Sequence, residues 1–166
     1  MNILIAYATK TGTTQKAASL LAEALAQKGV KADLFDLSVS SPDVTAYDAA
    51  VVGGSIRMSA LHKLARRFIA ANEAALLKMP AGFFCCRCGT DDTRSLLAPQ
   101  IGSGLAGHAA QVTALGGELD LSKQKGLDRL IVKMVSGQNN AMRPDGVSPE
   151  RVAAFVEALM EAASGV

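Results

Sequence analysis

The feature that most constrains the fold is an alternation of short apolar runs with segments of helical periodicity, repeated almost from end to end. A nearly continuous apolar run at residues 2–7 is typical of a strand that is buried on both faces. Further strands are expected at residues 30–34, 49–52, 81–86 and 112–119. The first of these alternates apolar with charged residues, so it should have one wet face near a sheet edge. The strand at 49–52 is expected to end at Gly53-Gly54.

The segments between these strands predict amphipathic helices. One is expected at about residues 14–28 and another around the apolar stripe at residues 61–69. Residues 93–110 contain Pro99 and three glycines, which favour only a short helix. The last helix has a clear start, because Ser148 can cap it and Pro149 suits its first position.

Repeated strand–helix–strand units predict an α/β fold in which helices cover both faces of a doubly wound parallel sheet. Five strands at this spacing fit the flavodoxin-like order 2-1-3-4-5. The competing dinucleotide-binding order would require Gly-x-Gly-x-x-Gly after the first strand, where this chain has a Thr-rich turn. The length of 166 residues predicts a single domain, residues 1–166, with an insertion at about 122–147.

Composition argues against several classes of protein. The 17 Lys and Arg residues nearly balance 15 Asp and Glu residues, giving a formal charge of +2, so we expect no nucleic-acid partner. No apolar stretch has the length of a bilayer-crossing helix, and we expect no signal peptide. Cys85, Cys86 and Cys88 lie too close together to cross-link the fold, which predicts a reducing, cytoplasmic location.

The turn after the first strand has the residues expected of a phosphate site, namely Thr9, Lys10, Thr11, Gly12, Thr13 and Thr14. Backbone N–H groups at a helix N-terminus bind a phosphate dianion with help from the helix dipole. The threonine hydroxyls add donors, and the glycine allows a tight turn. Thr-rich turns also cap helices that bind nothing, but this turn lies where the topology places a ligand. A P-loop would need Gly-Lys-Ser/Thr here, and a receiver domain would need acidic residues at the first strand.

This turn resembles the phosphate loop of flavodoxins. The chain also resembles a narrower group, the flavodoxin-like, quinone-dependent protoporphyrinogen IX dehydrogenases of bacteria. The matching residues are Val51-Val52-Gly53-Gly54-Ser55-Ile56-Arg57, His62, Met79-Pro80, Phe83-Phe84 and the stretch Leu-Asp-Arg-Leu-Ile-Val-Lys-Met at 127–134. The resemblance covers nearly the whole chain and is weakest at residues 87–110. It implies FMN as cofactor, a tetrapyrrole as substrate, and a quinone or a redox protein as partner.

In the flavodoxin-like fold, the loops after the third and fourth strands flank the flavin ring. The resemblance implies that the cofactor is bound there by Gly53, Gly54, Ser55, Ile56 and Arg57, and by Cys86, Arg87, Cys88 and Gly89. The two adjacent glycines are expected to let the backbone approach the ring. Arg57 is the candidate catalytic residue, since its guanidinium can offset negative charge on a reduced flavin or pair with a substrate carboxylate. A solvated surface arginine is an equally good interpretation.

Ordinary flavodoxins cover the ring with aromatic side chains, but this chain has no Trp, and Met58 follows Arg57. A less covered ring leaves room for a substrate, as a dehydrogenase requires. The even charge balance also differs from the strongly acidic electron carriers of this fold. An oxidoreductase is therefore favoured. The alternatives are a one-electron carrier without a small-molecule substrate and a binding module that holds no flavin.

The cysteine cluster and the insertion each have a purely structural interpretation as well as a functional one. The cysteines are interpreted as small apolar side chains of a buried strand, since only His62 and His108 could complete a metal site with them. His62 is expected on a helix surface. A basic amphipathic helix at residues 122–136 could contact the inner face of the cell membrane or cover a substrate cleft. It could equally pack on the domain or on a second subunit of a homodimer.

Overall fold

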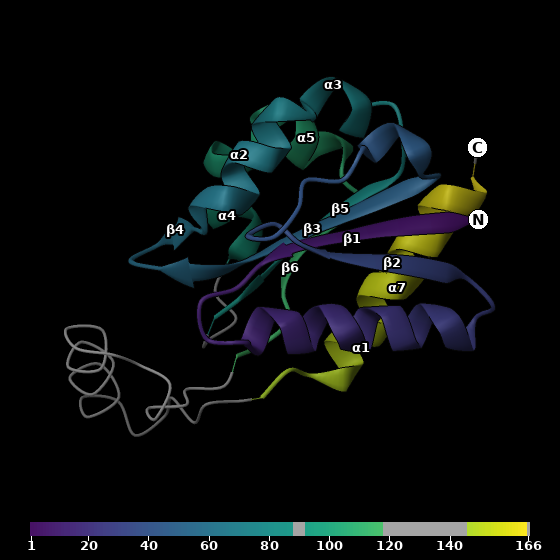
Figure 1. Ribbon diagram of the computed structural model, residues 1–166, viewed down its shortest axis with the longest axis horizontal. Helices are drawn as coiled ribbons and strands as arrows, with labels where there is room; N and C mark the ends of the chain where they lie inside the picture. Colours follow the sequence, from purple (N-terminus) through teal and green to yellow (C-terminus); the bar gives the residue numbers. More distant parts are fainter. Residues whose placement is uncertain (88–91, 118–145, 166) are drawn as a thin grey trace.

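The computed structural model describes residues 1–87, 92–117 and 146–165. Its five parallel strands are β1 (Asn2–Ala8), β2 (Lys31–Asp36), β3 (Ala49–Arg57), β5 (Ala81–Cys86) and β6 (Gln111–Ala114). They are ordered β2-β1-β3-β5-β6, and a short sixth strand, β4 (Ala60–Leu61), pairs antiparallel with the end of β3. The sheet lies between two layers of helices (Figure 1). The predicted flavodoxin-like fold is confirmed, with β2 at a sheet edge.

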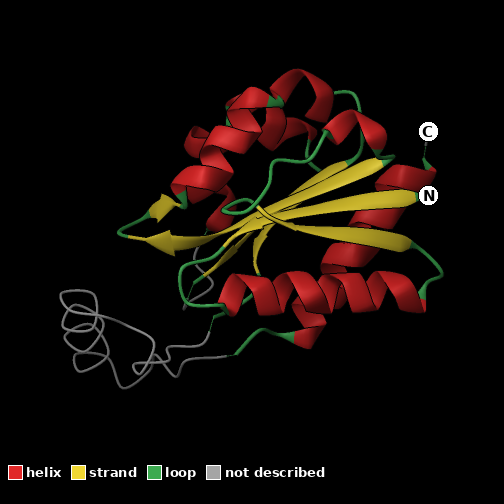
Figure 2. Ribbon diagram, in the orientation of Figure 1, coloured by secondary structure: helices red, strands yellow, loops and turns green. Residues whose placement is uncertain are grey.

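Each face of the sheet has its own helices (Figure 2). One face packs against α1 (Thr13–Gln27) and α7 (Pro149–Ser164). The other packs against η1 (Val44–Ala46), α2 (Lys63–Ala71), α3 (Glu73–Leu76), α4 (Thr93–Ile101) and α5 (Ser103–His108). No helix in the described ranges is both long and apolar enough to span a membrane.

Alternation along β5 explains why both layers are needed, because successive side chains point to opposite faces. Phe83 and Cys85 are buried on the α2 side, whereas Phe84 and Cys86 are buried on the α1 side. A strand that is apolar on both faces is stable only when both faces are covered.

Glycines in the central strands make room for two aromatic rings under α1 and α7. A Cβ atom on Gly53 would lie 2.1 Å from the ring of Phe84, and one on Gly82 would lie 2.6 Å from the ring of Phe155. The two rings meet edge to face, with centroids 6.3 Å apart and an interplanar angle of 85°. Each ring thus occupies the space that a larger residue on the neighbouring strand would fill.

The expected end of the third strand at Gly53-Gly54 is wrong, because β3 continues to Arg57. Both glycines are buried inside the strand. Gly54 leaves space for side chains that follow β3, since a Cβ atom there would lie 2.9 Å from Leu61 Cδ1 and 3.2 Å from Ala65 Cβ. Packing therefore requires both glycines, and their approach to a flavin stays a prediction.

Two further segments differ from expectation, and a third lies outside the described residues. The single short helix expected at 93–110 is two helices, separated at Gly102, which has a φ of 96°. The fifth parallel strand ends at Ala114, and Gly116 follows with a φ of 95°. A Cβ atom on Gly116 would lie 2.6 Å from Gly146 O, so the backbones of these two residues lie against each other. The helix expected at 122–136 falls outside the described residues.

Candidate cofactor site

The carboxyl ends of β1, β3 and β5 meet at one edge of the sheet. In the strand register Ala8 aligns with Gly54, and Ser55 aligns with Cys86. The turn that follows β1 therefore lies beside the end of β3, and the end of β3 lies beside the end of β5. The structure brings together the predicted residues of the first turn, of β3 and of β5; Cys88 and Gly89 lie outside the described residues.

The turn at residues 9–14 has a backbone suited to an anion. Gly12 adopts a φ of 95°, a left-handed conformation that favours glycine, and is the N-cap of α1. Its N–H donates to Thr9 Oγ1 at 2.9 Å, which holds the turn closed. The first helical bond runs from Lys16 N–H to Gly12 O at 3.1 Å. The preceding N–H groups have no acceptor within the helix, and the N-cap residue, a glycine, has no side chain that could cap them.

Thr14, in the first turn of α1, has a side chain that internal packing does not explain. It is fully buried, yet within the part of the chain that the structure describes its Oγ1 makes no hydrogen bond. The Cys86 thiol is near enough for a weak contact with Thr14 to lower the pKa of that thiol, but the contact does not meet hydrogen-bond geometry, and a thiol is a weak partner. Burying an unsatisfied hydroxyl is unfavourable by about 1–3 kcal/mol. An acceptor such as a phosphate oxygen would satisfy it, so these residues fit a phosphate group.

The start of α2 lies near the same turn, because His62, which precedes α2, is close enough to Lys10 to sense its charge. His62 is half-buried and caps α2, accepting a hydrogen bond from Leu64 N–H at Nδ1 over 3.3 Å. Burial and the nearby positive charge of Lys10 lower the pKa of His62, while Asp36 acts in the opposite direction. The expected helix-surface histidine is thus a capping residue. Histidine is not among the residues that usually cap a helix N-terminus, so the sequence carried no signal for this role.

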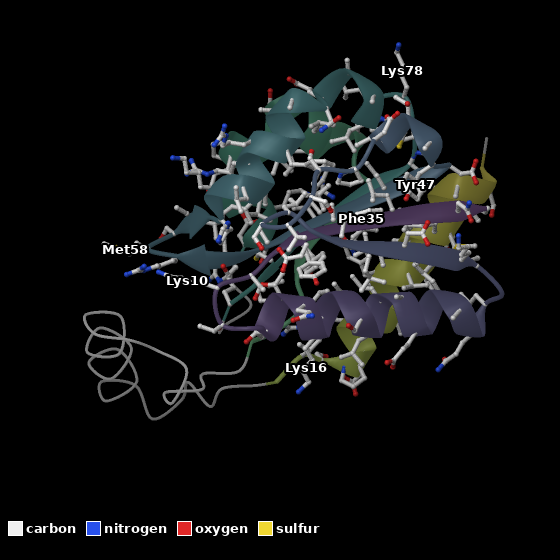
Figure 3. The ribbon with its side chains drawn as sticks, in the orientation of Figure 1. Lys10, Lys16, Phe35, Tyr47, Met58 and Lys78 are labelled. Atoms are coloured by element: carbon white, nitrogen blue, oxygen red, sulfur yellow. The ribbon has the colours of Figure 1, made fainter. Side chains whose placement is uncertain are left out.

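A projecting hairpin joins β3 to β4 beside this edge, with Met58 at its tip (Figure 3). Met58 and Ser59 both have positive φ values, 48° and 62°, as the tightest hairpin turns require. The amide of Gln100 in α4 accepts from Leu61 N–H at 2.7 Å and donates to Ser59 O at 3.0 Å. Gln100 therefore fixes the hairpin on the helix layer. No local pattern could identify this residue, because its partners are 39 and 41 positions away.

The remaining predicted ring-binding residues lie at the ends of β3 and β5. Ser55 and Ile56 are half-buried, and Ser55 O accepts from His62 N–H at 2.9 Å. Arg57 is exposed and pairs with Ala60, directly beside the tip of the hairpin. Arg87 is half-buried just after β5.

Cys85 and Cys86 behave as buried apolar side chains. Burial raises the pKa of each thiol to about 12, so neither is a thiolate at neutral pH. His108 Nε2 lies 2.8 Å from Met79 O, which precedes β5, whereas Cys86 ends that strand. Among the described residues no group of three or more His, Cys, Asp or Glu side chains could hold a metal ion.

A family model for the flavodoxin domain matches residues 4–143. The chain belongs to the flavodoxin family. Membership confirms the predicted class, a flavodoxin-like FMN protein. Fold comparison agrees: a short-chain flavodoxin associated with a non-canonical PDU bacterial microcompartment superposes with a TM-score of 0.65 at 16% identity, over 98% of this chain and 99% of its own. The flavodoxin of Fusobacterium nucleatum bound to flavin mononucleotide gives a TM-score of 0.58 at 11% identity, over 96% and 97% of the two chains.

A curated relative of this flavodoxin points to a narrower group. Protoporphyrinogen IX dehydrogenase [quinone] of Escherichia coli (strain K12) is 33% identical over 85 residues. That match covers 51% of this chain and 47% of the relative, so it spans about half the length of each protein. The resemblance noted in the sequence is confirmed at the level of homology.

Proposed function

We propose that this flavodoxin binds FMN and oxidises a protoporphyrinogen-like tetrapyrrole, passing the electrons to a quinone. The observation that carries the proposal is the buried hydroxyl of Thr14, unpartnered among the described residues, at the uncapped start of α1. The 33% identity to the E. coli enzyme supports the substrate class. A cytoplasmic location with contact to the inner face of the cell membrane belongs to the same proposal, since quinones are lipid-soluble.

The chain's own residues would hold and orient the cofactor. Backbone N–H groups of the first turn of α1 and the hydroxyls of Thr9, Thr11 and Thr14 would bind the phosphate, with Lys10 nearby. The ends of β3 and β5 would line the ring through Gly53, Gly54, Ser55, Ile56, Arg57, Cys86, Arg87, Cys88 and Gly89. Bound FMN would supply the redox chemistry.

Arg57 is proposed as the residue that meets the substrate. It is the last residue of β3 and is exposed, at the edge of the sheet where the turn at residues 9–14 lies. A planar guanidinium binds a carboxylate through two parallel hydrogen bonds, which a lysine ammonium cannot reproduce. Arg57→Gln should therefore lower kcat/KM by roughly 10- to 150-fold, the effect of one hydrogen bond to a charged group. Arg57→Lys should restore only part of the activity, and Lys78→Gln should leave it unchanged.

Porphyrin fluorescence tests the activity directly. FMN-loaded protein is mixed with protoporphyrinogen and a menaquinone analogue, with free FMN as the blank. The proposal predicts a protein-dependent rise in fluorescence that requires the quinone. A rate equal to that of the blank would reject it.

A second candidate is an electron carrier between proteins, which the full-length superposition on flavodoxins favours. It predicts rapid electron exchange with a flavodoxin reductase and no formation of porphyrin. A preparation that stays colourless after FMN is added would reject both functions and leave a binding module without flavin.

A further inference from the structure

The outward face of α2 carries an uncompensated positive charge. Lys63, Arg66 and Arg67 are all exposed, and the sequence has no acidic residue between Asp48 and Glu73. None of the three forms an ion pair with a carboxylate in the described part of the chain. Because the whole chain is nearly balanced in charge, this local excess is a property of one surface.

The hairpin that leads into α2 ends in an apolar tip. Met58 is 82% exposed at the end of the hairpin that leads into α2. Figure 3 shows it at the outermost point of the hairpin, with Lys78 on a distant part of the molecule. Gln100 fixes this hairpin through its bonds to Ser59 and Leu61, so the tip is held in place rather than free to fold back.

We propose that the hairpin tip and the outward face of α2 dock this protein on an anionic membrane surface. The side chains of Lys63, Arg66 and Arg67 contact the lipid headgroups, and Met58 enters the boundary between headgroups and acyl chains. Charge complementarity identifies the partner as anionic. Protein–protein interfaces usually have an apolar centre that is surrounded by a polar rim. Here the apolar residue is at a projecting tip, which fits a deformable lipid surface better than an acidic protein.

This docking surface is separate from the insertion at 122–147. It deepens the membrane contact of the proposed function and rests on that part of it, whereas vesicle binding can be measured whether or not the protein oxidises a tetrapyrrole. Docking also places the carboxyl edge of the sheet near the bilayer, because the hairpin extends β3 beyond that edge. A lipid-soluble reactant could then reach the edge without crossing water.

Vesicle co-sedimentation of the purified full chain tests the proposal, using phosphatidylglycerol–phosphatidylcholine vesicles at 40:60 and pure phosphatidylcholine vesicles. We expect retention on the anionic vesicles only, and its loss in 0.5 M NaCl. Lys63→Gln/Arg67→Gln should lower the partition coefficient roughly 30-fold, since each basic residue near an anionic leaflet contributes about fivefold. Met58→Ser should lower it roughly tenfold.

The matched control is Lys28→Gln/Lys78→Gln, which removes the same charge from exposed positions elsewhere and should bind like the wild type. Equal losses in both double variants would show a net-charge effect and overturn the proposal. If Met58→Ser bound the anionic vesicles as well as the wild type, Met58 would not contact lipid, and the proposal would be overturned as well. Failure of the wild type to bind anionic vesicles would overturn the proposal and favour an acidic protein as the partner of the basic face.

Discussion

Replacing Thr14 with Val should stabilise the protein without FMN while weakening its affinity for FMN. Valine keeps the branched shape of threonine and has a similar helix propensity, but it removes a buried hydroxyl that has no hydrogen bond among the described residues. Relieving such a group should raise the free energy of unfolding of the apoprotein by about 1 kcal/mol. For a chain of 166 residues this corresponds to a rise in Tm of roughly 2–4 °C.

The same substitution removes one donor to the phosphate. A hydrogen bond to a charged group contributes about 1.5–3 kcal/mol, so the Kd for FMN should increase roughly 10- to 150-fold. Riboflavin lacks the phosphate, and its Kd should not change. The two effects thus have opposite signs, which a purely structural threonine would not produce.

Urea unfolding of the apoprotein and quenching of flavin fluorescence measure the two quantities. Thr113→Val is the matched control, because Thr113 is half-buried in β6, away from the phosphate turn, and should leave the Kd for FMN unaltered. A destabilised Thr14→Val apoprotein that binds FMN as tightly as the wild type would refute the reasoning.

Three further substitutions and measurements follow from the packing and from the pKa shifts. Gly53→Ala should lower the free energy of unfolding by about 3 kcal/mol, because its Cβ would lie 2.1 Å from the Phe84 ring. In urea unfolding, adding Phe84→Leu to the same chain should recover part of that loss. Additive losses from the two substitutions would contradict the contact. The pKa of His62 is lowered in the folded protein, so its contribution to stability should be full above about pH 6.5 and lost as the pH falls through the folded pKa. In an NMR titration of Lys10→Met, the pKa of His62 should be higher than in the wild type, because burial lowers it but the charge of Lys10 no longer does. An unchanged pKa would exclude Lys10 as a cause of the shift. Cys86, whose pKa burial raises to about 12, should resist iodoacetamide at pH 8 until urea unfolds the chain, and rapid alkylation seen by mass spectrometry would argue for a reactive thiol.

The sequence was sufficient for the parts of the fold that local pattern determines. The apolar run at residues 2–7 and the run at 81–86 match β1 and β5 closely, because strands buried on both faces leave an uninterrupted apolar signature. Ser148 and Pro149 mark the start of α7 as expected, and Ser148 Oγ accepts from Arg151 N–H. Caps and buried strands are local features, so one sequence can show them.

Long-range packing accounts for what local pattern missed. Gly53 and Gly54 look like a turn, but they continue β3 because Phe84, Leu61 and Ala65 fill the space beside them. The last parallel strand ends early at Ala114, where the chain turns at Gly116 against Gly146. These contacts join residues far apart in the chain, so the periodicity of the sequence cannot predict them.

The candidate site divides in the same way. The unit of β1, turn and α1 could be predicted because its parts are contiguous, whereas phosphate binding by the turn stays a prediction. Gln100 could not, since only the folded chain brings α4 to the hairpin. The unpartnered state of the Thr14 hydroxyl also needed three-dimensional burial to be recognised.

Titration of the apoprotein with FMN and with riboflavin tests the central claim most directly. If the turn at residues 9–14 grips the phosphate through backbone N–H groups and hydroxyls, FMN should bind at least roughly 100-fold more tightly than riboflavin, since at least two hydrogen bonds to a charged group are added. Thr9→Ala/Thr11→Ala/Thr14→Ala should remove most of that difference while leaving riboflavin affinity intact. Equal affinity for the two flavins in the wild type would contradict the account.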